Sequence, residues 1–327
     1  MQDGGIVTLP AGEVGPNWNY LSVEGNTLGM HNYWLLYMPE AIKSDATLTS
    51  FTPDPDLISN LSSSTDSGKL VVTVDINDKA QFNDGTPIDY RALQPIWTVM
   101  NGQSDAYTPS ATDGYDKIES VEQGDNPKQA VITFSDPVFP YEPIVTQLLH
   151  PDAVDPDTYQ TGWNNNPHPE WGYGPYTIQD CSTNQVTFVP NPNWWGRKPK
   201  LDSIIYKQME SQALFNAFKN GEVDATGESQ AGSQEMLSNF SDMSDVTIHR
   251  ANSLSISNIE INMTRPVVND IAVRKALYQC IDSATVRNVI WQGVNWDEET
   301  PGSLLSPAWA DGYEDNRPDD VKNLNSA

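Results

Sequence analysis

Two stretches of alternating apolar and polar residues place the strongest constraint on how this chain folds. In residues 69–77, KLVVTVDIN, the side chains of Val72, Val74 and Ile76 fall on one side of an extended backbone. Residues 129–136, QAVITFSD, alternate in the same way. A period of two residues is typical of a strand with one face buried and the other in water. The two stretches therefore predict half-buried strands.

Further strands and helices are predicted along the rest of the chain. The expected strands are residues 6–9, 185–189, 202–208 and 254–263. The expected helices are the apolar stretch 31–42, the amphipathic segment 211–226, and the segments 269–282 and 283–293. Strands and helices mix without a strict β–α–β repeat, and no internal repeat is visible. This pattern predicts an α/β or α+β fold with an insertion.

Residue types at the helix ends predict where two of these helices begin and stop. Ser211 is expected to cap the helix of 211–226, and Gly221 to stop it, because glycine accepts the backbone conformation found at helix C-termini. Asn269 or Asp270 is expected to cap the helix of 269–282. The face of that helix expected to point inward consists of Val273, Ala276, Leu277 and Cys280.

The stretch QFNDGTPIDY, residues 81–90, raises the question whether it binds a metal ion or forms a turn. A helix–loop–helix calcium loop needs oxygen ligands at alternate positions and a closing glutamate. Lys79 stands where the third ligand should be, and no glutamate follows at the required distance. Asp84-Gly85 is instead a strong turn signal, and Asp89 can cap the helix expected after it. We therefore expect a structural turn.

The net charge of the chain argues against nucleic acid and anionic membranes as binding partners. The 327 residues are enough for two or three packed units, and they carry 44 acidic and 18 basic residues, for a net charge of −26 and a pI of about 4.2. Such a surface repels nucleic acid and anionic membranes. The acidic residues are spread thinly rather than in blocks, which favours solubility outside the cell or at high salt over attraction of cationic substrates.

The two cysteines and the N-terminal residues say little about the function of the protein. Cys181 and Cys280 have no metal-binding spacing, and we expect two separate buried thiols, with pairing across the fold left open. No apolar run approaches the length that spans a bilayer. Met1 is followed by a polar, glycine-rich leader in place of a signal peptide, which we interpret as the start of a trimmed chain.

Motifs for catalysis are missing or incomplete. There is no phosphate-binding loop and no dinucleotide fingerprint. Residues 227–231 come near a hydrolase nucleophile elbow but lack its final glycine. The acidic residues offer no carboxylate pair that stands out as an acid/base couple. No metal-ligand spacing links the four histidines, His31, His150, His168 and His249. The sequence therefore favours a binding protein over an enzyme, with no cofactor.

Several short motifs agree in order and spacing with one family. In chain order they are FNDGTP at 82–87, GPY at 174–176, NPNWWG at 191–196, KPKLD at 198–202, NGEVD at 220–224 and RPVVNDIAVRKAL at 265–277, followed by Ile281-Asp282. Each motif is weak alone, but together they are specific, and they cover residues 5 to about 305. The chain resembles the family 5 extracellular solute-binding proteins, the oligopeptide- and dipeptide-binding receptors of bacterial ABC importers.

The resemblance implies an α/β fold of the type II periplasmic-binding-protein kind, a bilobed clamp that closes on its ligand by a hinge motion. It implies a first lobe made of residues 1–48 and 172–266, with a subdomain of residues 49–171 inserted into it. The second lobe begins at 267, beside a hinge at Arg265-Pro266, and is expected to be incomplete at 327.

The resemblance also implies that the turn at 82–87 joins a strand to a helix away from the ligand. Pro95 departs from the family pattern, because it falls where the interior of that helix should be. We therefore expect the helix to begin late or to kink.

The resemblance also implies which residues face the ligand. Residues 23–26 match a short strand that pairs with the peptide backbone in peptide-binding relatives, and Glu24, Gly25 and Asn26 are its candidate contacts. Glu24 can also attract an amino group, or be only an exposed loop acid. Tyr107 falls at an aromatic contact of the inserted subdomain, and His150 belongs to a His-Pro pair found in some peptide receptors.

Other candidate contacts leave the kind of ligand open. Four further positions of the first lobe match contact positions: Gly227, Glu228, Ser257 and Asn258. Relatives often carry tyrosines at the last two, so small polar residues there also allow sugars, opines or metal chelates as ligands. Trp18 and Trp171 are expected to line the cleft, where an exposed indole stacks on a sugar or covers an apolar side chain. Trp194 and Trp195 are expected to pack against the lobe.

The leading hypothesis is a monomeric, extracellular substrate-binding component of an ABC transporter that captures an oligopeptide and delivers it to permease subunits. It is not an enzyme, binds no nucleic acid, and is expected to be a lipoprotein anchored through a removed N-terminal segment. The alternatives are a receptor for an oligosaccharide or other small solute, a surface carbohydrate-binding or enzymatic module, and a peptide-scavenging chaperone. The polar, proline-rich residues after 293 cannot form a lobe core, so we expect a half clamp that cannot bind normally.

Overall fold

The computed structural model describes residues 3–45, 50–66, 68–226, 240, 243–249, 259–290, 302–303, 308–310 and 312–317. The chain divides into two compact units, one made of residues 1–43 and 51–226 and the other of 44–50 and 227–327. The predicted boundaries near 48, 171 and 266 stay predictions. In the described part of the chain, no helix is both long and apolar enough to cross a membrane.

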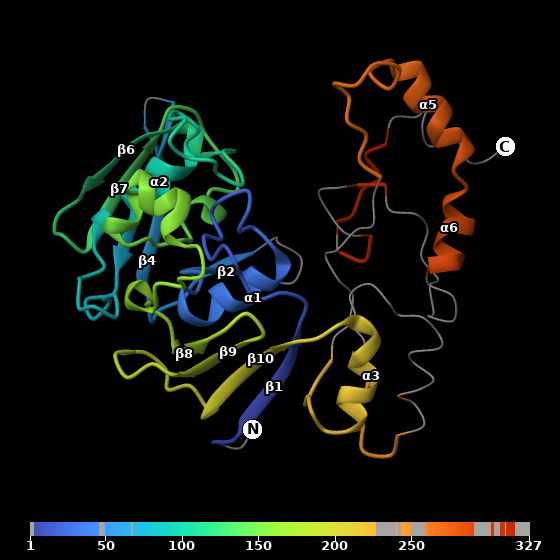
Figure 1. Cartoon of the computed structure of the whole chain (residues 1–327). Helices are drawn as coiled ribbons and strands as arrows, with labels where there is room; N and C mark the ends of the chain where they lie inside the picture. The colour runs from blue at the N-terminus through green and yellow to red at the C-terminus, as the bar shows by residue number, and fades with distance from the viewer. Residues whose placement is uncertain are drawn as a thin grey trace. The chain divides into compact units, whose positions relative to one another are not determined.

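The first unit contains a mixed four-stranded sheet in which the chain returns to its own beginning (Figure 1). The strand order is β1 (Ile6–Ala11), β10 (Ser203–Gln208), β9 (Gln185–Pro190) and β8 (Tyr176–Cys181). β1 and β10 run parallel, and the other neighbours are antiparallel. Asp224, in the motif NGEVD, covers the outer edge of β1. Its N–H donates to the Thr8 carbonyl at 2.8 Å, and its carboxylate accepts the Thr8 N–H at 2.7 Å.

The second sheet of this unit is antiparallel and confirms both alternating stretches as strands. Its order is β4 (Ile58–Asp66), β5 (Lys69–Ile76), β7 (Gln129–Phe134) and β6 (Ile118–Gln123). Val72 lies opposite Ile132, and Val74 opposite Ala130, so the buried positions of β5 and β7 share one face. β2 (Ile42–Ser44) pairs with β3 (Phe51–Pro53) in a small separate sheet.

The helices of the first unit begin where local capping allows. α1 (Leu28–Tyr37) is capped by the Thr27 hydroxyl, which accepts the Met30 N–H at 3.2 Å. A 3-10 turn (Tyr90–Ala92), capped by Asp89 as predicted, precedes α2 (Leu93–Met100). Pro95 lies in the first turn of α2, where its missing N–H costs no intrahelical bond. The prediction that this helix begins late is therefore confirmed.

Two predictions about helix ends and faces need correction. Ser211 is already the first residue of α3 (Ser211–Lys219), whose N-cap is Glu210 without a side-chain cap, whereas Gly221 does follow the helix, with a φ of +71°. α5 (Ile271–Cys280) is capped by Asp270 as predicted, but none of its residues is buried. The inward face expected for α5 is therefore wrong, because Ala276, Leu277 and Cys280 are exposed, Leu277 by 41%, and Val273 is only half-buried.

Short elements complete the described chain. α6 (Ser283–Ile290) follows α5. Residues 254–258 of the predicted strand 254–263 lie outside the described residues, and residues 259–263 form no strand. Cys181 is half-buried and Cys280 is exposed, so the expectation of two buried thiols is wrong for Cys280. The remaining short turns are Tyr115–Lys117, Glu142–Ile144, Pro151–Val154, Thr158–Gly162 and Pro169–Trp171.

Candidate ligand-binding site

Residues 23–26, expected to form a short strand, form a tight turn that begins at Ser22. The Asn26 N–H donates to the Ser22 carbonyl at 3.0 Å, and the Gly25 N–H to the Ser22 hydroxyl at 3.1 Å. Gly25 is buried, and a Cβ on it would lie 2.1 Å from the Asn19 carbonyl oxygen. The turn thus requires glycine at this position, and the strand expectation is wrong.

The turn is joined to the inserted segment that carries Tyr107. The Val23 N–H donates to the Thr108 carbonyl at 3.0 Å, and the Ser110 N–H to the Leu21 carbonyl at 2.8 Å. The Tyr107 hydroxyl donates to the Val154 carbonyl at 2.7 Å. The structure therefore brings Glu24, Gly25, Asn26 and Tyr107 together, although they come from distant parts of the sequence.

A third loop completes this region. The Asn19 side-chain amide donates to the Tyr159 carbonyl at 3.1 Å, and the Gln160 side-chain amide to the Ala106 carbonyl at 2.8 Å. The Tyr159 ring packs edge-on against Tyr107 with centroids 5.0 Å apart, and burial raises the pKa of Tyr159. We call residues 15–26, 104–110 and 154–166 together the loop surface.

The turn leaves backbone groups free on the loop surface. Among the described residues, the Glu24 N–H and the Val23 carbonyl have no hydrogen-bond partner. Glu24 and Asn26 are exposed, and the side chains of Val23 and Leu28 are 63% and 68% exposed. Free backbone donors and acceptors between exposed apolar side chains suit the binding of an extended chain.

Trp18 and Trp171 lie in the core, so the expectation of exposed indoles is wrong. Trp18 is 1% exposed and Trp171 is 8% exposed. The indole of Trp171 is parallel to the imidazoles of His168 and His150, at centroid distances of 3.8 Å and 5.4 Å. The buried contacts of Trp171 are thus made with other aromatic rings of the protein.

His150 has structural contacts on all sides of its ring. It is 3% exposed, its Nδ1 accepts the Asp152 N–H at 3.2 Å, and its Nε2 lies 3.2 Å from the Asp84 carboxylate. Its ring meets Phe82 edge-on at 4.8 Å. The His-Pro pair therefore packs against the turn at 82–87. The buried Nε2 of His150 makes no hydrogen bond among the described residues, although it lies close to the Asp84 carboxylate.

The turn at 82–87 is the meeting point of three of the family motifs. The Asn83 side-chain amide donates to the Pro169 carbonyl at 2.8 Å. The Asn191 side-chain amide donates to the Asn83 side-chain oxygen at 2.8 Å and to the Gly174 carbonyl at 2.7 Å. Gly85 has a φ of +91°, as the turn requires. These contacts hold together the motifs FNDGTP, GPY and NPNWWG, which is a structural role.

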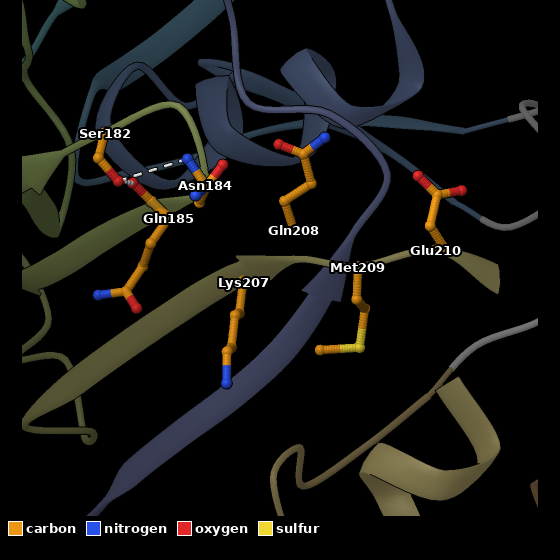
Figure 2. Close-up of a pocket in the computed structure, with 7 residues that line it drawn as sticks. All are labelled: Ser182, Asn184, Gln185, Lys207, Gln208, Met209 and Glu210. Carbon is orange, nitrogen blue, oxygen red and sulfur yellow. Dashed lines mark hydrogen bonds between the residues drawn. The ribbon is translucent and has the colours of Figure 1, made fainter. Parts of the chain in front are cut away.

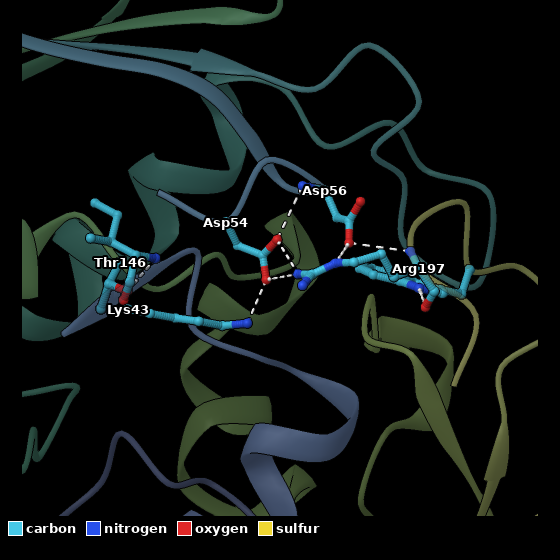
Figure 3. Close-up of polar contacts among 7 residues, drawn as sticks. Lys43, Asp54, Asp56, Thr146 and Arg197 are labelled. Atoms are coloured by element: carbon cyan, nitrogen blue, oxygen red, sulfur yellow. Dashed lines mark hydrogen bonds and ion pairs between the residues drawn. The ribbon is translucent and has the colours of Figure 1, made fainter. Parts of the chain in front are cut away.

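A buried carboxylate anchors the end of the third motif (Figure 3). Asp54 is 7% exposed and accepts hydrogen bonds from Lys43 Nζ at 2.6 Å and from Arg197 Nη2 at 2.9 Å. Arg197 also donates to Asp56 at 2.8 Å, and the indole N–H of Trp195 donates to the Asp56 carbonyl at 2.6 Å. Trp194 and Trp195 pack partly buried against the core, as expected.

The protonation of Asp54 follows from these contacts. Burial raises its pKa, but the hydrogen bond from Lys43, the backbone N–H of Asp56 and the charge of Arg197 together hold the pKa below its ordinary value. Asp54 is therefore ionised at neutral pH, and it neutralises two cations that are largely exposed.

An open hollow of about 570 Å³ lies where strands of the first sheet end (Figure 2). β1, β8 and β10 run in the same direction, and the hollow lies at the carboxyl ends of β8 and β10, the edge where ligands bind in many α/β proteins. It is lined by Ser182, Asn184, Gln185, Lys207, Gln208, Met209 and Glu210. Sequence reasoning missed this hollow, because no motif marks the ends of β8 and β10 that form it.

The remaining candidate contacts cannot be placed. Gly227, Glu228, Ser257 and Asn258 lie outside the described residues. Within the described ranges, no group of three or more His, Cys, Asp or Glu side chains is arranged to hold a metal ion.

Comparison with known proteins identifies the fold and the family. The periplasmic EDTA-binding protein EppA superposes with a TM-score of 0.83 at 25% identity, over 99% of this chain and 62% of that protein. The oligopeptide-binding protein AppA from Bacillus subtilis, in complex with a nonapeptide, superposes with a TM-score of 0.74 at 16% identity, over 99% of this chain and 63% of its own. The predicted fold class, an α/β fold of the type II periplasmic-binding-protein kind, is confirmed.

The family follows from the sequence. Residues 52–327 match the family described as bacterial extracellular solute-binding proteins, family 5 Middle. The oligopeptide-binding protein OppA from Mycobacterium tuberculosis is 28% identical over 323 residues, which are 97% of this chain and 54% of OppA. The chain belongs to the family 5 solute-binding proteins, as the motifs predicted. It spans about half the length of this curated relative.

Proposed function

We propose that this chain is part of an extracellular receptor that binds an oligopeptide and delivers it to the permease subunits of an ABC importer. The observation that carries the proposal is the turn at 22–26, which offers a free N–H at Glu24 and a free carbonyl at Val23 on an exposed surface. An extended peptide pairs with such groups through its own backbone, whatever its side chains are.

The relatives support a peptide as the ligand. OppA, similar over nearly the whole of this chain, is an oligopeptide-binding protein. The family description supports a location outside the cytoplasm, and we extend the proposal to a monomeric lipoprotein tethered at the cell surface. The proposed role is capture and delivery without chemistry, which the description of the family as solute-binding proteins supports.

The experiment is a calorimetric titration of the chain with peptides of three to nine residues, which also tests the expectation that a half clamp cannot bind normally. Gly25→Ala should abolish binding while circular dichroism stays native, because a Cβ there meets the Asn19 carbonyl and forces the turn open. Gly12→Ala is the matched control, since a Cβ on Gly12 meets nothing within 4 Å. Binding by Gly25→Ala as tight as by the unchanged chain would show that the turn is not the peptide site.

An oligosaccharide is the second candidate ligand, and the hollow at the sheet edge favours it. Its side-chain amides and hydroxyl, from Asn184, Gln185, Gln208 and Ser182, are groups that hydrogen-bond sugar hydroxyls. Titration with chitotriose and maltotriose, repeated on Gln208→Ala, tests this alternative. Saturable binding weakened by Gln208→Ala would favour sugar over peptide.

A further inference from the structure

Basic residues are absent from three long segments of the chain. Residues 1–42, 92–116 and 129–196 contain no Lys or Arg, although the chain has 18. An even spread would place about seven of the 18 in these 135 residues. The acidic residues show no such gap, because 14 of the 44 lie in the same segments. The excess of negative charge is therefore unevenly distributed, although the acidic residues alone are spread thinly and by themselves favoured solubility over attraction of cations.

The fold brings these three segments together at the loop surface. Residues 15–26, 104–110 and 154–166 each lie inside one of the segments without Lys or Arg, and backbone and side-chain hydrogen bonds join all three. The exposed charged residues of the loop surface are all carboxylates: Glu24, Asp105, Asp155 and Asp157. Asp155 is held ionised, because its Oδ1 accepts the Thr158 N–H at 2.9 Å and this hydrogen bond lowers its pKa.

We propose that the loop surface selects ligands of net positive charge, such as peptides rich in Lys or Arg, and rejects polyanions. The inference rests on the proposed function in one respect, since it takes the loop surface as the place where the ligand binds. A ligand carboxylate at this surface finds no ammonium or guanidinium group on the three loops, whereas a ligand with several ammonium groups finds four exposed carboxylates on them.

A preference for cationic over anionic ligands would distinguish this chain from a protein of the same fold. EppA, which superposes closely, binds EDTA, a polyanion. The loop surface of this chain lacks the cations that would neutralise such a ligand. Charges on the loop surface act over about 10 Å at 0.1 M salt and about 3 Å at 1 M salt. The preference should therefore weaken strongly as salt rises, unlike one set by shape.

The first test compares peptides that differ mainly in charge. The 327-residue chain is titrated with trilysine, trialanine and triglutamate at 0.1 M and at 1 M salt. We expect trilysine to bind about tenfold or more tighter than triglutamate at 0.1 M, and the ratio to fall to about twofold at 1 M. Triglutamate binding as tightly as trilysine at 0.1 M would overturn the inference and leave the proposed peptide-binding function standing.

The second test separates local charge from total charge. Glu24→Gln combined with Asp157→Asn removes two negative charges from the loop surface. Glu122→Gln combined with Asp125→Asn removes two exposed negative charges from the β6–β7 hairpin, outside that surface. The first pair should lower the preference for trilysine at least about threefold at 0.1 M salt, and the second pair should leave it within about 1.5-fold. Equal effects of both pairs would show that only net charge matters, which overturns the inference.

A third pair of probes applies if no peptide binds. Spermidine and EDTA carry opposite charges and no peptide backbone. Binding of spermidine without binding of EDTA, lost in Glu24→Gln with Asp157→Asn, would support the cationic preference of the surface while the peptide function fails. Binding of EDTA in preference to spermidine, or of neither, would overturn the inference as well.

Discussion

Replacing Asp54 by asparagine removes the charge that holds Lys43 and the loop at Arg197 together within the first unit. The change keeps the size of the side chain and its acceptor for the Asp56 N–H, which lies 3.1 Å from Asp54 Oδ1. It replaces Oδ2, which accepts hydrogen bonds from Lys43 at 2.6 Å and from Arg197 at 3.0 Å, by an NH2 group that cannot accept them. The oxygen that remains is an uncharged acceptor for Arg197, at 2.9 Å. The perturbation is therefore electrostatic and makes no cavity.

The magnitude follows from how exposed the partners are. A hydrogen bond to a charged group contributes about 1.5–3 kcal/mol when it is shielded from solvent. The side chains of Lys43 and Arg197 are 57% and 70% exposed, so solvent screens both pairs and each contributes closer to 1 kcal/mol. We expect Asp54→Asn to lower the free energy of unfolding by about 1–2 kcal/mol at pH 7, and Tm by roughly 3–6 °C.

The direction in which the contribution of Asp54 to stability changes with pH follows from its pKa. The pKa of Asp54 is held below its ordinary value in the folded chain, so its stabilising contribution is complete above the unfolded pKa, near 4. The contribution is lost as pH falls through the lower, folded pKa. The difference in stability between the unchanged chain and Asp54→Asn should therefore shrink in acid.

Urea denaturation followed by tryptophan fluorescence, at pH 7 and at pH 3, measures both effects. Asp116→Asn is the matched control, because Asp116 pairs with Lys117 at 3.3 Å on the surface and both side chains are more than 40% exposed. We expect the control to change stability by less than about 0.5 kcal/mol. A difference for Asp54→Asn that stays constant from pH 7 to pH 3 would refute the picture of an ionised, paired Asp54.

Two further predictions concern the family turn and the thiols. Asp84→Ala should lower the free energy of unfolding by about 1–2 kcal/mol, because Asp84 accepts hydrogen bonds from the Thr86 N–H at 2.8 Å and the Thr86 hydroxyl at 3.0 Å. Peptide affinity, measured by calorimetry, should not change, and a large loss in a folded variant would contradict the structural role of the turn. Burial raises the pKa of the Cys181 thiol to about 11, so iodoacetamide at pH 8 should label exposed Cys280 first, as mass spectrometry of the digest can show. Faster labelling of Cys181 would contradict its burial.

Local rules predicted the elements whose signals lie in neighbouring residues. Alternation located β5 and β7, because a strand in a half-buried sheet exposes every second side chain. The acidic caps at Asp89 and Asp270 and the late start of α2 at Pro95 follow from which backbone groups the first turn of a helix leaves free. β4 escaped prediction, because ISNLSSSTD is a polar edge strand with little alternation.

Sequence by itself determined the family, because several weak motifs in fixed order are jointly specific, and it also determined the absence of Lys and Arg from three segments. Only the tertiary structure decided where those features lie in space. It buried Trp18 and Trp171, formed a turn where residues 23–26 were expected to be a strand, and paired β1 with β10, which are distant in sequence. The physical reason is that burial and site formation depend on contacts between residues far apart in the chain, which no local pattern records.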